Sequence, residues 1–457
     1  SQGGWTALSS EGRYMGATAY GDMNRATNPY YQRLRAIFDF RPGGDLRLNR
    51  SLANWPRSML YKPYTQDLID ILGAPIAPEQ MWNPDSVLRV EDICHRSNTQ
   101  ERLDKAAATQ LVFEDGLFHV IDALIRETGA EQLVLTGGAA LNAVANMRLL
   151  ERFDEAYYRR ALGRAARLRL WVPPVPGDSG VTIGAAYAFA AKAGVGLGPR
   201  LEHAFYCGRA ARLAEIQAAF GGASDVASVE IGDVSRAGDI AAIADLMAFI
   251  TERDGVIALF QGPAETGPRA LGHRSILANP RNPQTRETLN QRVKYREAIR
   301  PLAPMATLSA VLELFELSDG AAADDYNAYN YMVLTARAKP IALERVPAVI
   351  HADGTARVQI VREKTDPVVH AYLQALGRRI GVEVAVNTSF NVAGPIVQTP
   401  AQAVETLHRA KGMDGLFMIS AEGPALLVWL KREGAGERIE SWLAAWRAEN
   451  CAAASGE

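Results

Sequence analysis

The pattern of apolar and polar residues along the chain predicts alternating helices and short buried strands. Residues 101–128 carry apolar side chains at helical spacing and end at Gly129, which predicts one long helix. Continuous apolar runs at residues 255–260 and 416–419 predict two buried strands. An alternation of this kind is typical of an α/β fold, in which helices cover a sheet.

A domain boundary is expected near residues 221–236, between an apolar helical stretch and a helix predicted at residues 240–253. The chain has 457 residues, of which 48% are hydrophobic, so it can bury a large core. This length is typical of two or more domains. We therefore expect one domain over residues 1–225 and a second over residues 226–457.

Composition narrows the class of protein. The net charge of -2 gives no overall attraction to nucleic acid or to an anionic membrane, so either partner would need a local patch. The three cysteines are far apart and lack metal-type spacing, which argues against a disulfide scaffold and a cysteine zinc site. No apolar run approaches the roughly twenty residues that a membrane span requires. We expect a cytoplasmic protein without a membrane segment.

The run GPRALGHRSILANP at residues 267–280 combines a Gly-Pro turn, two arginines and a histidine, with little core-forming pattern. It follows the strand predicted at residues 255–260, and ligands commonly bind at strand ends. Arg269 and Arg274 suit a phosphate or pyrophosphate, because a guanidinium grips such anions with paired N–H donors. We expect a loop that holds an anion; the alternative is a turn with solvated arginines.

Two further segments carry similar chemistry. Residues 294–304 place three cations before a proline-rich break, namely Lys294, Arg296 and Arg300. Residues 384–391 form a short apolar run that breaks into polar side chains able to bind an amide or a ribose, among them Asn387, Ser389 and Asn391. For the second segment, the alternative is a turn in which Asn and Ser side chains bond to their own backbone.

Two glycine-rich turns precede predicted helices in the first half of the chain. A strand at residues 133–136 leads through Gly137 and Gly138 into a helix, which is the arrangement of a phosphate or ribose cradle, although a simple turn explains it equally. Asp178 precedes a helix predicted at residues 181–191 and is of the residue type preferred as an N-cap.

These segments, taken in order, resemble the O-carbamoyltransferase family known as NodU/CmcH. The resemblance spans most of the chain. It rests on EGRYMGATAYG at residues 11–21, LTGGAALNAVAN at 135–146, PVPGDSGVTIGAAY at 174–187, FQGPAETGPRALGHRSILANPRNP at 260–283, VKYREAIRPLAP at 293–304, HADGTARVQIV at 351–361 and NTSFNVAGPIVQTP at 387–400.

The resemblance implies an actin/sugar-kinase-like transfer domain followed by a YrdC-like carbamoyl-activating domain. In the family, strands with a phosphate loop and a His-x-x-x-His metal motif precede the first of these blocks. Here only ten residues precede it, and no two of the seven histidines are spaced in this way. We therefore expect the amino-terminal part of the first domain to be missing from this sequence.

The resemblance also implies a reaction. ATP and carbamoyl phosphate would give carbamoyl-adenylate, and the carbamoyl group would pass to an acceptor hydroxyl. The expected catalytic residues are Arg269, His273, Lys294, Arg296 and Ser389, with His273 either a base or a structural histidine. The expected binding residues for carbamoyl phosphate and nucleotide are Gly137, Gly138, Asn142, Arg274, Arg300, Asn387 and Asn391. Asp178 would be a ligand of Fe(II) or another divalent metal, such as Mg²⁺.

The acceptor remains open. A small natural product or sugar is the family's commonest substrate class. Residues 157–171 are more basic than the family's usual connection, and they predict either a solvated helix face or contact with a hydroxymethylated pyrimidine in nucleic acid. The arginines concerned are Arg159, Arg160, Arg164, Arg167 and Arg169. An inactive nucleotide-binding module is a third alternative, and a homodimer is compatible with the sequence.

Overall fold

The described chain divides into two compact units. The computed structural model describes residues 11–52, 65–74, 97–196, 206–318, 327–392, 394–432 and 434–455. Unit 1 comprises residues 1–135, 142–171 and 297–300, and unit 2 comprises residues 136–141, 172–296 and 301–457. The boundary predicted at residues 225 and 226 falls within unit 2 and stays a prediction.

Unit 1 is organised around the long helix α5 (Ser97–Thr128), which confirms the helix predicted from the apolar spacing. The helix ends at Gly129, whose positive φ of 66° suits glycine. The other elements of unit 1 are α1 (Glu11–Ala17), α2 (Tyr31–Leu34), β1 (Phe38–Phe40), β2 (Leu46–Leu48), α3 (Gln66–Leu72), β3 (Gln132–Val134), α6 (Ala143–Arg152), α7 (Glu155–Leu162) and β4 (Arg169–Trp171), with 3-10 turns η1 (Thr18–Tyr20), η2 (Arg35–Ile37) and η3 (Pro42–Gly44).

The core of unit 1 forms where α5 meets the segments that follow it. Ile121 and Ile125 on α5 pack with Leu149 on α6 and with Phe153 and Tyr158 in a buried cluster. The strands β3 and β4 pair in parallel next to this cluster. The basic stretch at residues 157–171 is therefore partly internal, because its tyrosines belong to the core.

Unit 2 is built on a mixed sheet of eight strands in the order β14-β10-β15-β9-β7-β16-β17-β6. Parallel pairs (β10 with β14, β7 with β16) stand among antiparallel ones. The strands are β6 (Val226–Asp233), β7 (Ile257–Phe260), β9 (Arg274–Ala278), β10 (Ala303–Ala306), β14 (Gln359–Ile360), β15 (Val384–Ser389), β16 (Gly415–Ile419) and β17 (Pro424–Leu430). The predicted α/β class is confirmed at this level.

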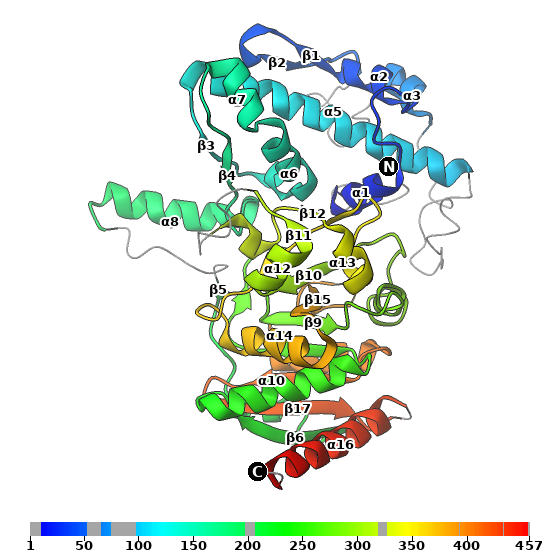
Figure 1. The fold of residues 1–457 in the computed structure, drawn as a ribbon, viewed down its shortest axis with the longest axis vertical. Coiled ribbons are helices and arrows are strands. Elements are labelled where there is room, and N and C mark those ends of the chain that lie inside the picture. The colour runs from blue at the N-terminus through cyan, green and yellow to red at the C-terminus, as the bar shows by residue number, and fades with distance from the viewer. Residues whose placement is uncertain are drawn as a thin grey trace. The chain divides into compact units, whose positions relative to one another are not determined.

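Three helices cover one part of this sheet. The helices α10 (Ala237–Glu252) and α14 (Pro367–Ile380) lie side by side over the strands, and α16 (Ala435–Ser455) packs beside α10 and β17 (Figure 1). Arg379 on α14 joins the three helices, because it bonds to Asp245 on α10 and to Glu449 on α16. The helix α15 (Pro400–Arg409) is capped by Thr399, whose hydroxyl accepts from the Gln402 N–H.

The remaining elements of unit 2 are short connections. They are η5 (Gly138–Leu141), η6 (Asp178–Gly180), α8 (Val181–Lys192), β5 (Tyr206–Cys207), α9 (Leu213–Ala218), β8 (Ala264–Glu265), α11 (Thr285–Thr288), the π-helical η7 (Leu289–Val293), α12 (Leu308–Leu314), β11 (Phe315–Glu316), η8 (Ala328–Tyr331), β12 (Ala336–Ala338), α13 (Pro340–Arg345), η9 (Pro347–Val349) and β13 (Thr355–Ala356). Among the residues described, no helix has the length and apolar character needed to cross a membrane.

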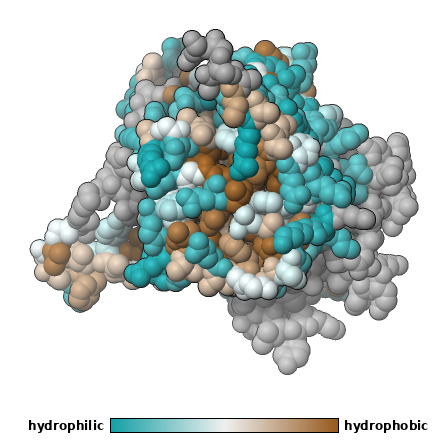
Figure 2. Space-filling model, turned by 90° about the horizontal axis from the view of Figure 1, so that it is seen from below, coloured by the Kyte–Doolittle hydropathy of each residue, from teal (hydrophilic) through white to brown (hydrophobic). Residues whose placement is uncertain are grey.

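Among the described residues, the surface of unit 2 exposes apolar side chains on α8, and also at Leu312, Ile341 and Leu343. The helix α8 is apolar around its whole circumference, yet Val181 is 68% and Phe189 75% exposed. A helix of this kind is usually buried. Seen from the end at which β6 and α16 lie, hydrophobic residues also gather in the centre of a face, within a rim of hydrophilic ones (Figure 2).

The structure corrects the prediction that residues 267–280 form a loop with little core-forming character. Residues 274–278 are the strand β9, whose five residues are all buried in the middle of the sheet. Arg274, Ser275 and Asn279 obscured this strand in the sequence, because polar residues interrupt its apolar run. The side chain of Asp178, predicted as a helix N-cap, makes no capping bond; the residue opens the 3-10 turn η6 and is exposed.

Candidate functional site

The register of the sheet brings the predicted segments of unit 2 to one edge. The strand β9 runs between β7 and β15, with Arg274 opposite Phe260 and Ser275 opposite Ser389. The end of β7, the start of β9 and the end of β15 therefore lie together. The start of β10 joins them, because Ala303 is opposite Asn387. Chain segments more than a hundred residues apart thus meet at this edge.

Lys294 lies buried at this edge, with 6% of its surface exposed. Its ammonium group donates to the carbonyl oxygens of Ser389 and Asn391, both at 2.7 Å, to the Ser389 hydroxyl at 3.3 Å, and to the Asn391 side-chain oxygen. The Ser389 hydroxyl also donates to the Asn391 Oδ1 at 2.7 Å. The sequence-predicted residues Lys294, Ser389 and Asn391 therefore form one cluster, and these oxygen partners are neutral.

Asn387 lies two residues before Ser389 on β15, and its side-chain oxygen is an acceptor that no described residue uses. Its Nδ2 donates to the Ala270 carbonyl at 2.9 Å and to the Gln359 Oε1 at 2.8 Å. Its Oδ1 is buried and has no hydrogen-bond partner among the residues described. A buried acceptor in this state is costly unless water or a ligand satisfies it.

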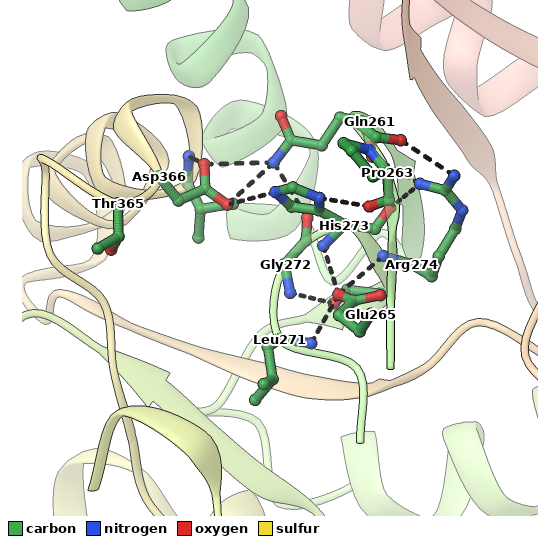
Figure 3. Close-up of polar contacts among 12 residues, drawn as sticks. Gln261, Pro263, Glu265, Leu271, Gly272, His273, Arg274, Thr365 and Asp366 are labelled. Carbon is green, nitrogen blue, oxygen red and sulfur yellow. Dashed lines mark hydrogen bonds and ion pairs between the residues drawn. The ribbon is translucent and has the colours of Figure 1, made fainter. Parts of the chain in front are cut away.

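Glu265 shapes the loop between β8 and β9. Its Oε1 accepts the backbone N–H groups of Leu271 at 2.8 Å, His273 at 2.7 Å and Arg274 at 3.2 Å (Figure 3). Hydrogen bonds from N–H groups to a carboxylate are stronger than those to a neutral acceptor, so Glu265 fixes the backbone of the turn that leads into β9. Its Oε2 is buried without a partner in the described structure.

Arg274 points into the protein. Its guanidinium donates to the carbonyls of Gln261, His273 and Gly262, and it lies 3.7 Å from the centre of the Phe260 ring. Burial lowers the pKa of Arg274 to about 10, and the charge of Glu265 opposes this shift. The guanidinium thus binds backbone carbonyls that close the loop, and its predicted role as an anion ligand stays a prediction.

His273 is held on both sides of its ring. Its Nδ1 donates to the Pro263 carbonyl at 2.6 Å, and its Nε2 lies 4.0 Å from the Asp366 Oδ2 (Figure 3). The ring stacks on Tyr206 with centroids 3.8 Å apart. Gln261 bridges the two segments by donating to Asp366 and to the Gly272 carbonyl. These contacts favour the structural alternative for His273, although its role as a base stays a prediction.

The sequence did not point to Gln261, Asp366 or Tyr206. Asp366 caps α14 by accepting the Val369 N–H at 3.0 Å and faces the His273 loop at the same time. Burial raises the pKa of Asp366, while the nearby His273 opposes this shift. Asp366-Pro367 is a typical helix start in the sequence, but only the fold shows that the cap also contacts the loop.

The other predicted cations lie in different surroundings. Arg269 is half-buried in the loop before β9. Arg296 donates through Nε to the Asn290 side chain at 2.6 Å, within unit 2. Arg300 belongs to unit 1, where its Nη1 lies 3.9 Å from the Glu297 carboxylate.

The glycine cradle predicted in the first half of the chain is divided between the units. Gly137, with a φ of 93°, donates its N–H to the Pro176 carbonyl at 2.7 Å in unit 2, and Gly138 begins η5. Asn142 belongs to unit 1, where it caps α6 and exchanges hydrogen bonds with Gln110 on α5. The nucleotide-binding roles of these three residues stay predictions.

The described residues do not by themselves fit a metal ion. Within the parts of the chain that the structure describes, no group of three or more His, Cys, Asp or Glu side chains could hold one. Asp178 is exposed at the start of η6. Its role as a metal ligand stays a prediction.

The basic stretch at residues 157–171 is engaged within unit 1. Arg159 and Arg167 form ion pairs with Glu155, and Arg164 pairs with Glu131. Tyr157 and Tyr158 are buried in the core, so these rings are not available for stacking on a base. The contact with nucleic acid stays a prediction.

Comparison with known proteins gives two matches of the same family. Residues 2–187 match the family model described as carbamoyltransferase N-terminus, and residues 248–421 match the model described as carbamoyltransferase C-terminus. The second match contains the buried edge with Lys294, Ser389 and Asn391.

Several curated relatives align over much of the chain. It is 31% identical to an uncharacterized protein, sll1178, of Synechocystis over 91% of this chain and 64% of the relative. It is 34% identical to the nodulation protein NolO of Bradyrhizobium diazoefficiens over 72% of this chain and 57% of the relative. Nodulation protein U of the same organism is 28% identical over 82% of this chain and 61% of the relative. The chain thus spans less than two thirds of the length of these relatives.

Proposed function

Because the chain belongs to the carbamoyltransferase family, we propose that it takes part in ATP-dependent carbamoyl transfer to a hydroxyl group. The observation that carries the proposal is the buried cluster of Lys294, Ser389 and Asn391, which lies within the matched C-terminal region. The chain covers only part of its relatives, so this proposal concerns the reaction to which the chain contributes.

The proposed reaction has two stages. Carbamoyl phosphate, ATP and one water give carbamoyl-adenylate, phosphate and pyrophosphate. The carbamoyl carbon then forms a bond to the acceptor oxygen, its bond to the AMP phosphate oxygen breaks, and the acceptor proton is released. The first stage is assigned to unit 2, where the cationic and amide side chains gather.

Lys294 would stabilise the negative charge of carbamoyl phosphate. An ammonium group fixed before the substrate arrives needs no reorganisation, and its effect is strongest where water is excluded. Its three N–H donors are shared among four oxygen atoms of Ser389 and Asn391, which hold this group in place. Arg269 and Arg296 would contribute further positive charge.

Asn387 would recognise the carbamoyl amide. Its buried Oδ1, which no described residue satisfies, can accept a bond from the substrate NH₂ group. This interaction would let the site discriminate carbamoyl phosphate from acetyl phosphate, which has a methyl group in place of the NH₂ group. A buried acceptor left unpaired by the wrong substrate costs about 1–3 kcal/mol.

The mixed sheet of unit 2 supports a YrdC-like activating domain, and the N-terminal family match supports an actin/sugar-kinase-like transfer domain. Both assignments are part of the proposal. The acceptor is proposed to be a small natural product or sugar. No step is routed through a metal ion, because the described residues do not form a site for one.

The test follows the products of the first stage. Purified protein is incubated with ATP and carbamoyl phosphate, and phosphate, pyrophosphate and carbamoyl-adenylate are measured. We expect pyrophosphate release that requires both substrates and is at least tenfold slower with acetyl phosphate. Absence of pyrophosphate release above a no-enzyme control would overturn the proposal for this chain and favour a nucleotide-binding module.

A further inference from the structure

Unit 1 contains a cavity of about 640 Å³ that the proposed reaction does not use. One wall is the carboxyl-terminal half of α5, and other residues of the lining come from α2, η2 and β1, with Arg152 at the end of α6. The volume is in the range of sites for small molecules. All the residues that line it belong to unit 1.

The lining of this cavity carries an excess of positive charge. Four arginines face only two aspartates, which leaves two positive charges without a counter-charge in the lining; these are Arg25, Arg35, Arg126, Arg152, Asp115 and Asp122. Glu114, which lies outside the lining, is 3.6 Å from Arg25 and offsets part of this excess, so one to two positive charges are left to match an anion. A phosphate monoester carries close to that charge at neutral pH.

The aspartates serve to hold the arginines. Asp115 accepts from Arg25 at 2.8 and 3.0 Å, from Arg35 at 3.2 Å and from the Tyr31 hydroxyl at 2.5 Å. Asp122 accepts from Arg126 and from the Tyr157 hydroxyl, each at 2.7 Å. Both carboxylates therefore bond to arginine and tyrosine side chains of the fold, and the guanidiniums are oriented before a ligand arrives.

Several guanidinium donors are still free to bind a ligand. Arg35 and Arg126 bond to their aspartates through Nε, and no hydrogen bond within the described chain uses their terminal amino groups. Arg152 makes no hydrogen bond or ion pair with any residue that the structure describes; its charge acts on Asp122 from a distance. A guanidinium has five N–H donors, so each of these arginines can still grip an oxyanion.

Aromatic rings form the rest of the cavity wall. The guanidinium of Arg35 lies 4.1 Å from the centre of the Phe40 ring, and Phe40 packs edge-on against His119 at 5.3 Å. The His119 Nε2 bonds to the Arg41 carbonyl at 2.8 Å, which fixes its ring. Phe118 completes this wall. Such a surface favours a flat, apolar group.

We propose that this cavity binds a small phosphate monoester whose organic part carries a flat, apolar group. The arginines would bind the phosphate, and the rings of Phe40 and Phe118 would contact the organic part. The proposal does not depend on the carbamoyl chemistry, because it involves neither Lys294 nor the sheet edge of unit 2.

Binding can be measured directly by titration calorimetry of the whole chain with phenyl phosphate, inorganic phosphate and benzyl alcohol. We expect phenyl phosphate to bind most tightly, inorganic phosphate more weakly and the neutral alcohol not at all. The affinity for phenyl phosphate should fall as salt is raised, because part of it is Coulombic. Equal affinity for phenyl phosphate and inorganic phosphate would overturn the part assigned to the aromatic wall.

Variants locate the ligand. Arg152→Gln removes a side chain that makes no hydrogen bond or ion pair with a described residue, and we expect about tenfold weaker binding of phenyl phosphate, as for one lost charge-assisted hydrogen bond. Arg126→Gln should act in the same direction. Arg47→Gln, at an exposed position on β2 and outside the lining, is the matched control and should leave binding unchanged.

Lys294→Gln separates this cavity from the proposed carbamoyl phosphate site. Phenyl phosphate binding that survives Lys294→Gln and weakens in Arg152→Gln supports the proposal. Binding that is lost in Lys294→Gln and unchanged in both arginine variants places the phosphate in unit 2 and overturns it. The same holds if no phenyl phosphate binding is found in a protein whose thermal unfolding shows that it is folded.

Discussion

The imidazole of His273 stacks on the ring of Tyr206, with planes only 8° apart. This contact joins β5 to the turn before β9, and Glu265 ties the same turn to β8. The loop that leads into the candidate site is therefore fixed by a ring stack on one side and a carboxylate on the other.

Replacing His273 should show whether the ring acts by packing. His273→Phe keeps a stacking ring and loses the bond to the Pro263 carbonyl, so we expect the free energy of unfolding to fall by about 1 kcal/mol. His273→Ala removes the stack as well and should cost about 2–3 kcal/mol. Chemical denaturation measures both. Equal losses in the two variants would show that the stack contributes nothing.

Glu265 offers a second test of the loop. Glu265→Ala leaves three backbone N–H groups of the turn without their acceptor, and we expect a loss of about 3 kcal/mol in the free energy of unfolding. Glu265→Gln keeps an acceptor oxygen and should lose less, about 1–2 kcal/mol. Glu230→Ala, at an exposed position on β6, is the control and should change stability by less than about 0.5 kcal/mol.

Lys294 should control the proposed activation step. Lys294→Met removes the fixed ammonium group, and we expect pyrophosphate release from ATP and carbamoyl phosphate to fall about a hundredfold or more. Lys431→Met, at an exposed lysine that donates to the Ser224 carbonyl, should keep the wild-type rate. A Lys294→Met protein that is folded and fully active would remove this residue from the mechanism.

Arg379 should contribute to the free energy of unfolding, and its contribution should depend on pH through its ion pair with Asp245. Burial raises the pKa of Asp245, but hydrogen bonds from Arg379 and Trp446 outweigh burial and bring it below its ordinary value. Arg379→Gln at neutral pH should cost about 2 kcal/mol, less than for a fully buried pair because Asp245 is partly exposed.

The sign of the pH effect follows from the lowered pKa. The contribution of Asp245 is complete above the ordinary aspartate pKa and is lost as the pH falls through the lowered value in the folded state. Denaturation at pH 7 and near pH 3 should therefore show a smaller difference between the wild type and Arg379→Gln at the lower pH. A difference that does not change with pH would contradict this account.

The elements with a strong apolar pattern could be predicted, and those with mixed patterns could not. The helix α5 and the strands β7 and β16 follow directly from the order of apolar residues in the sequence, because those residues are the ones that pack into the core. The strand β9 was missed, since it begins with Arg274, whose charge usually indicates a surface. In the fold, three carbonyls and the Phe260 ring surround that charge, and these partners come from outside the strand.

The contacts within the candidate site could not be predicted from the sequence. The sequence pointed to Lys294, Ser389 and Asn391 separately, and only the tertiary fold brings Lys294, which follows η7, to the end of β15. Asp366 and Tyr206 gave no signal, because one looks like a helix cap and the other belongs to a two-residue strand. Their roles come from tertiary contacts with His273.

The pairing of β9 with β15 also bears on the order of folding. Lys294 is separated by 95 positions from Ser389, its partner on β15. During synthesis this ammonium group cannot reach its final surroundings until the chain beyond Asn391 has emerged, and contacts of such long range form slowly. The cluster of Lys294, Ser389 and Asn391 therefore cannot form before β15 has been synthesised, although Lys294 precedes Ser389 by 95 positions.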